Sequence, residues 1–148
     1  PAWTWFGQPR DYPAPFALAL VLAPLVLLFG HAPHAPEPGR VLLYMGWALL
    51  QQWLMLTVVL RRLEHVFMRE ATAVITCALL FALMHTPNAR LMLLCLLAEA
   101  WWAHVFLRRR ALVPIALAHA VMALAIEASL AGGWLRSLEV GARYFMPR

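Results

Sequence analysis

Five long apolar stretches divide this chain, and each is long enough to cross a lipid bilayer as an α-helix. They run over residues 14–30, 41–60, 71–88, 91–107 and 111–131. A spanning helix needs about 20 predominantly apolar residues. A segment in lipid must also satisfy its own backbone hydrogen bonds, so helices are expected and strands are not. The sequence therefore predicts an all-α fold, a polytopic membrane helical bundle of about five transmembrane helices.

The composition agrees with a chain surrounded by lipid. Of its 148 residues, 64% are hydrophobic and 13% are charged, whereas a soluble domain is about half apolar and a quarter charged. We expect one integral membrane domain over residues 1–148. Its N-terminal segment, 1–13, carries aromatic residues suited to the lipid headgroup region, and the tail, 132–148, has the mixed character of an interfacial segment.

The arginines predict how the chain is oriented. The connections between the second and third stretches and between the fourth and fifth hold three arginines each, and the other two hold one each: Arg61, Arg62 and Arg69; Arg108, Arg109 and Arg110; Arg40; Arg90. Short connections rich in basic residues stay in the cytoplasm. The pattern predicts a multi-pass protein of a bacterial inner (cytoplasmic) membrane, with its N-terminus inside and its C-terminus outside. This rule explains the net charge of +5, and with no basic groove of interleaved aromatics we expect no nucleic-acid partner.

Polar side chains at the centre of the membrane are the candidate functional residues. Gln51 and Gln52 fall near the middle of the second stretch, Glu99 near the middle of the fourth and His119 near the middle of the fifth. His85 lies six residues beyond the middle of the third, roughly 9 Å along a helix. A charged side chain at this depth costs on the order of 2.5–3.5 kcal/mol, so such residues indicate a functional site. The alternative is that they hold helices together by hydrogen bonds.

Three short motifs carry a resemblance to a known family. They are the segment around Gln51 and Gln52, then FALMH ending at His85, then ALAHAVMA containing His119. Their order and spacing resemble the intramembrane protease family of CAAX prenyl-protein endoproteases and bacteriocin-processing enzymes, often called the CPBP or ABI family. That family has E-E-x-x-x-R, F-x-x-x-H and H-x-x-x-N or H-x-x-x-D, each on its own helix. The family-like core covers about 41–131.

The chain departs from this pattern in its first and third motifs. The resemblance implies that a glutamate of the first motif activates water for attack on a peptide bond, assisted by the histidines. Here Gln51 and Gln52 replace both glutamates, Leu56 replaces the arginine and Ala123 replaces the last polar residue. A general base must accept a proton near the working pH, and a glutamine amide is far too weak a base. We therefore expect a divergent pseudoprotease.

Three functions follow as hypotheses. The first is a non-catalytic scaffold or accessory subunit without a cofactor, which binds a partner membrane helix in the former substrate cavity, with Trp47, Trp53, Trp101 and Trp102 as a lateral surface. The second is an active metallo- or glutamic-type endopeptidase in which Glu99, His85 and His119 act together, since two histidines and a carboxylate can hold catalytic zinc. The third is a subunit that binds haem or a macrocyclic pigment through His104, which has small neighbours that allow a flat ring to approach.

Overall fold

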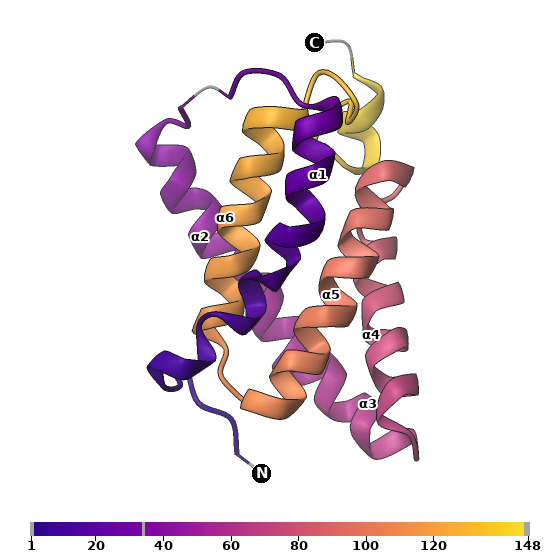
Figure 1. Cartoon of the computed structure of the whole chain (residues 1–148). Helices are drawn as coiled ribbons and strands as arrows, with labels where there is room; N and C mark the ends of the chain where they lie inside the picture. Colours follow the sequence, from indigo (N-terminus) through magenta and orange to yellow (C-terminus); the bar gives the residue numbers. More distant parts are fainter. Residues whose placement is uncertain (1, 34, 147–148) are drawn as a thin grey trace.

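The computed structural model describes residues 2–33 and 35–146, and nearly all regular structure in them is helical (Figure 1). The α-helices are α1 (Ala19–Phe29), α2 (Pro38–Gln52), α3 (Arg61–Val66), α4 (Glu70–Leu83), α5 (Ala89–Arg109) and α6 (Val113–Leu130). Short 3₁₀ turns cover Pro9–Asp11, Ala14–Leu18 and Gly141–Phe145. The predicted all-α class is confirmed.

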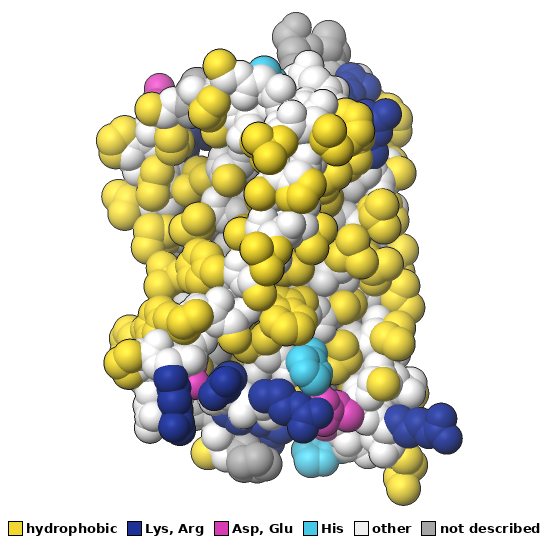
Figure 2. Space-filling view, viewed as in Figure 1, with side chains coloured by type: hydrophobic (Ala, Val, Ile, Leu, Met, Phe, Trp, Pro, Cys, Tyr) yellow, Lys and Arg dark blue, Asp and Glu magenta, His cyan; other side chains and the backbone are white. Residues whose placement is uncertain are grey.

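Four helical segments are long and apolar enough to cross a membrane: Pro9–Phe29, Pro38–Val66, Ala89–Arg109 and Val113–Leu130. The remaining apolar helix is α4, with 14 residues. Figure 2 shows apolar side chains covering the middle of the molecule, while dark-blue basic side chains gather mainly at its lower end. This distribution is that of a membrane-spanning helical bundle, as the sequence predicts.

The second span is longer than expected because α2 continues without a break into α3. The eight residues between them, Trp53–Leu60, form a π-helix. Within it, the Thr57 hydroxyl donates to the Trp53 carbonyl at 2.6 Å. Such wide turns are rare and often mark functional sites. Here the widened stretch begins directly after Gln52, the second residue of the first motif.

The third span is shorter than expected because α4 ends at Leu83 instead of reaching residue 88. Pro87 follows, and a proline disfavours helical backbone in the residue before it. The Thr86 hydroxyl donates to the Leu83 carbonyl at 2.6 Å, which satisfies one of the freed acceptors at the helix end. His85 therefore lies in the turn after α4.

Two pairs of helices make the most extensive contacts in the bundle. The first pair is α4 with α5, and the second is α2 with α6. Small buried side chains on the first pair, Ala73, Cys77, Ala78 and Ala103, allow close approach of the two backbones. Within the described part of the chain, α2 makes few contacts with α4 and α5, and this separation leaves room for a cavity.

Both ends of the described chain pack onto the bundle. Residues 131–146 fold over the ends of α5 and α6, where the Leu135 side chain is completely buried. The Asn88 side chain holds this tail by donating to the Ser137 carbonyl at 2.7 Å. At the opposite end of the bundle, Thr4 pairs with the connection between α5 and α6 (Figure 1).

Candidate functional site

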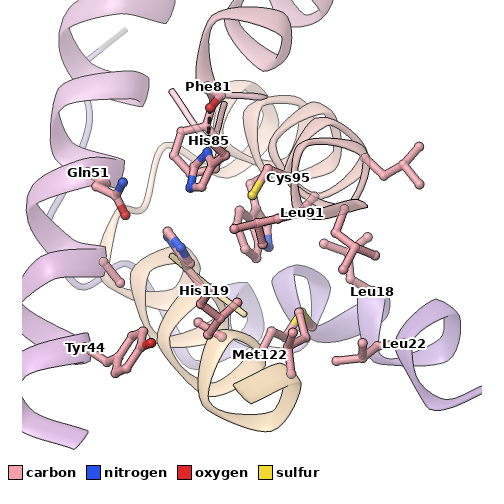
Figure 3. Close-up of a pocket in the computed structure, with 18 of the residues that line it drawn as sticks. Leu18, Leu22, Tyr44, Gln51, Phe81, His85, Leu91, Cys95, His119 and Met122 are labelled. Carbon is pink, nitrogen blue, oxygen red and sulfur yellow. Dashed lines mark hydrogen bonds between the residues drawn. The ribbon is translucent and has the colours of Figure 1, made fainter. Parts of the chain in front are cut away.

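A cavity of about 400 Å³ lies between α1, α2, α4, α5 and α6. Most of its walls are apolar, but one part of its lining is polar. Gln51 of α2, His85 of the turn after α4 and His119 of α6 point toward one another there (Figure 3). Three segments that are distant in sequence thus bring the three family motifs together at one part of the cavity.

The Gln52 side chain points into the interior of the bundle and does not line the cavity. Its Nε2 donates to Glu99 Oε2 at 2.9 Å and also lies 3.2 Å from His119 Nδ1. Gln52 and Glu99 are both completely buried. The amide therefore bridges the carboxylate of α5 and the imidazole of α6, and it holds both side chains in place.

These contacts define which nitrogen of each imidazole is free. His85 Nδ1 donates to the Phe81 carbonyl at 2.8 Å, so its Nε2 remains an acceptor. His119 Nδ1 accepts from the Gln52 amide, so its Nε2 carries the proton and remains a donor. Both rings are also held by aromatic neighbours. Phe81 lies 4.8 Å from the His85 ring and 5.7 Å from the His119 ring, and Trp102 lies 5.0 Å from the His119 ring.

The second carboxylate oxygen of Glu99 is only weakly bonded. The Cys77 thiol lies 3.9 Å from Glu99 Oε1 and 3.6 Å from the Met55 carbonyl. Among residues 2–33 and 35–146, no side chain or backbone group donates to the buried Gln52 Oε1. The hydrogen bonds of this interior network are therefore concentrated on the Gln52 amide nitrogen.

A sequence model of one family matches this chain. Its description is Type II CAAX prenyl endopeptidase Rce1-like, and it matches residues 48–125, more than half of the chain. The chain belongs to this family. No curated protein and no solved structure matches the chain. The match includes all three motif segments of the Rce1-like pattern and confirms the resemblance inferred from them.

The departures from the family pattern have clear places in the structure. Leu56, which replaces the arginine of the first motif, is completely buried in the apolar core. Ala123, which replaces the last polar residue of the third motif, lines the cavity. Both positions have become apolar, so they leave the polar part of the cavity to Gln51, His85 and His119.

The predicted zinc ligands do not form a donor set. Among residues 2–33 and 35–146, no three His, Cys, Asp or Glu side chains are placed to hold a metal ion. The physical reason is the direction in which Glu99 points. Its Oε2 accepts from Gln52, and the same amide occupies His119 Nδ1. Glu99 shares the predicted depth of His119, but it does not line the cavity.

His104, the predicted ligand of a macrocycle, lies away from this cavity. Its side chain is about half exposed, and Nδ1 lies 3.6 Å from a Glu70 oxygen. The Trp101 ring is 6.0 Å from the imidazole. Of the four tryptophans expected on a lateral surface, Trp102 is buried, while the other three are exposed. Trp102 packs inward because its Nε1 donates to the Pro15 carbonyl at 3.2 Å.

Sequence reasoning missed an ion pair beside the cavity. Arg40 of α2 donates to Glu127 of α6, and Arg40 and Tyr44 also line the cavity. The available signal was a pair of opposite charges at the same end of the second and fifth spans. That α2 and α6 are neighbours could not be read from the sequence.

Proposed function

We propose that this Rce1-like protein is a non-catalytic membrane receptor that binds a transmembrane helix of another protein at its cavity. The observation that carries the proposal is the bridge that Gln52 makes to Glu99 and His119. The three family motifs contribute one amide and two imidazoles to the cavity lining, while Glu99 is completely buried. A general base for water activation is therefore missing where the family pattern places it.

The polar part of the cavity suits an uncharged partner group. His85 offers an acceptor, His119 offers a donor, and the Gln51 amide offers both. A serine, threonine, asparagine or glutamine side chain could pair with all three. Such side chains associate transmembrane helices with about 1–2 kcal/mol each. We infer that the partner helix carries one of them at the depth of the two histidines.

The surroundings of the cavity support a helix as the occupant. Leu43 and Trp47 of α2 and Leu97 of α5 line the cavity and are about half exposed or more. They offer apolar surface on two helices of the cavity to a neighbouring helix. Helices in a bilayer associate through such packing together with a few interhelical hydrogen bonds. A bound helix would cover this apolar surface and insert one polar side chain into the cavity.

Defined transmembrane peptides test this proposal. The protein is reconstituted in vesicles, and energy transfer to peptides with a central glutamine or a central leucine is measured. We expect the glutamine peptide to bind about tenfold more tightly, which corresponds to 1–2 kcal/mol. His119→Phe should abolish this preference, whereas His104→Phe, which removes an imidazole outside the cavity, should not. Equal binding of both peptides, or binding of neither, would contradict the proposal.

A second candidate is an active glutamic-type endopeptidase, favoured by the family match and by the position of Glu99. The Glu99 carboxylate accepts a 2.9 Å hydrogen bond from Gln52, which occupies the second position of the first motif. Glu99 would replace the missing glutamates if Gln52 moved aside. Incubation of reconstituted protein with a peptide library tests this candidate. Cleavage that is lost in both Glu99→Gln and His85→Ala would establish it, and the non-catalytic proposal expects no product.

We also propose that the end bearing residues 2–11 and α3 faces the cytoplasm of a bacterial inner membrane. Arg61 and Arg62 begin α3, Arg69 precedes α4, and Arg108, Arg109 and Arg110 end α5 or follow it; these segments share one end of the bundle (Figure 1). Their excess over the opposite end follows the rule that basic connections remain inside.

A further inference from the structure

A second pocket lies at the arginine-rich end of the bundle, outside the candidate site. It has a volume of about 680 Å³, and it is formed by residues 4–8, Arg10 and Asp11 together with Arg108 and Arg109 at the end of α5. Backbone hydrogen bonds fix the N-terminal wall. Thr4 N donates to the Arg110 carbonyl at 2.7 Å, and Val113 N donates to the Trp5 carbonyl at 2.8 Å.

The turn at Gly7 gives this wall a defined shape. Gly7 has a φ of +65°, a conformation that side chains rarely adopt, and a Cβ there would lie 2.5 Å from the Ala111 Cβ. Gln8 N donates to Asp11 Oδ2 at 2.8 Å and closes the turn. The pocket is thus built by the fold of residues 4–11 against the connection between α5 and α6.

Positive charge dominates this end of the protein. The segments that form this end contain seven arginines and three acidic residues: Arg10, Arg61, Arg62, Arg69, Arg108, Arg109 and Arg110, and Asp11, Glu64 and Glu70. Within the pocket, Arg109 lies 3.8 Å from Asp11. Arg108 lies 3.2 Å from Glu70, a carboxylate outside the pocket lining that also contacts His104. Arg10 is exposed. A Glu64 oxygen lies 2.8 Å from the guanidinium of Arg110, an arginine outside the pocket. Glu64 therefore does not neutralise the arginines of the pocket.

We propose that this pocket binds the headgroup of an anionic phospholipid. Arginine forks match the oxygens of a phosphodiester, and clustered arginines beside a transmembrane helix attract anionic lipids. Trp5 and Phe6 on the rim are 48% and 68% exposed, and aromatic side chains settle at headgroup depth. The pocket also lies directly beside the apolar span Ala89–Arg109. A lipid therefore supplies both the anion for the arginines and the acyl chains for the neighbouring apolar surface.

Lipid retention by the full chain tests this assignment. The protein is purified in mild detergent with equal amounts of phosphatidylglycerol and phosphatidylcholine, and bound lipids are counted by native mass spectrometry. We expect phosphatidylglycerol to be preferred, with about a fivefold loss for each arginine removed. The test variants are Arg10→Gln and Arg109→Gln. Arg90→Gln and Arg136→Gln remove the same charge at the opposite end and should leave the preference unchanged.

Three results would overturn the proposal. The first is equal retention of the two lipids by the wild-type protein. The second is an equal loss in the opposite-end variants, which would indicate a general effect of net charge. The third is thermal stabilisation by inorganic phosphate equal to that by phosphatidylglycerol, which would indicate a soluble anion. The wild-type comparison remains decisive if a variant fails to fold.

Discussion

Gln52 forms structural hydrogen bonds, whereas the glutamate that it replaces could accept a proton. A carboxylate beside Glu99 and His119 would bring two acidic groups within hydrogen-bond distance in the membrane interior, and only one of them could remain charged at a tolerable cost. The amide instead donates to both neighbours. The substitution therefore removes a proton acceptor and adds a structural crosslink between α2, α5 and α6.

A double-mutant cycle measures this crosslink. Gln52→Leu leaves Glu99 without its strongest donor, and Glu99→Leu leaves the amide with one acceptor, so each should lower the free energy of unfolding by about 1–3 kcal/mol. The double variant should lose less than the sum, with a coupling of roughly 0.5–3 kcal/mol. Unfolding by denaturant in mixed micelles provides the values. Strict additivity would show that the bond contributes nothing, and Gln51→Leu serves as a control at the cavity surface.

Depth along each span could be read from the sequence, but direction could not. Counting from the span ends places Gln52, Glu99 and His119 at one level, and the structure brings them into contact. Adjacent residues on a helix point about 100° apart, so the sequence alone could not decide that Gln51 faces the cavity and Gln52 the interior. The zinc hypothesis rested on depth and residue type, and side-chain direction adds that Gln52 lies between Glu99 and His119.

At the scale of elements, Asn88 joins the start of α5 to the C-terminal tail. Its Oδ1 accepts from Leu91 N at 3.3 Å, which caps the helix, and its Nδ2 donates to the Ser137 carbonyl at 2.7 Å. The side chain is buried. One residue therefore satisfies backbone groups of two segments, and neither segment can move without leaving a polar group unpaired.

Asn88→Ala should lower the free energy of unfolding by about 1–3 kcal/mol, since it removes the cap and leaves buried groups unpaired. Asn88→Asp keeps the acceptor for Leu91 N but loses the donor to Ser137, so it should not restore stability. Limited trypsin digestion at Arg136 and Arg143 reports release of the tail. An aspartate variant as stable and as resistant as wild type would refute the clamp.

The connection between α1 and α2 docks on the end of α6 through His31. Its Nε2 lies 2.9 Å from the Ala131 carbonyl and its Nδ1 lies 3.2 Å from the Ala32 carbonyl. Only a protonated ring donates from both nitrogens. These bonds, chiefly the one to Ala131, raise the pKa of His31 above its ordinary value of 6.5.

Docking of this connection should therefore depend on pH. Because the pKa is higher in the docked state, the contribution of His31 is complete below its ordinary pKa and is lost as pH rises through the raised value. NMR titration of the imidazole and amide exchange of residues 131–135 follow the change. His31→Gln should remove the pH dependence. A measured pKa at or below the ordinary value would show that the ring does not donate to Ala131.

The element boundaries show what a hydropathy pattern can predict. The existence and order of the spans follow from composition, because lipid admits only segments with internally satisfied backbones. The π-helix at Trp53–Leu60 leaves no mark in the pattern, since its residues are as apolar as those of an ordinary span. Within the π-helix, Leu56 and Leu60 pack into the core. This packing depends on the other helices, which the hydropathy pattern of one span does not describe.

At the scale of the whole molecule, the two ends of the bundle differ in charge and in what they carry. The end with residues 2–11 and α3 holds the arginine excess and the proposed lipid pocket. At the other end, Arg40 and Glu127 pair beside the cavity, and the tail folds over the bundle. If the first end faces the cytoplasm, the cavity beside Arg40 and Glu127 is nearer the outer leaflet.

Single-cysteine labelling in intact cells tests this orientation. Cys77 and Cys95 are first replaced by alanine, and Gln8→Cys or Arg143→Cys is then introduced in separate proteins. Because basic connections remain inside, a membrane-impermeant maleimide should label position 143 in intact cells and position 8 only after permeabilisation. The reverse pattern would invert the bundle and place the lipid pocket in the outer leaflet. Labelling of both positions in intact cells would contradict an odd number of spans between them, and with it the five-span fold.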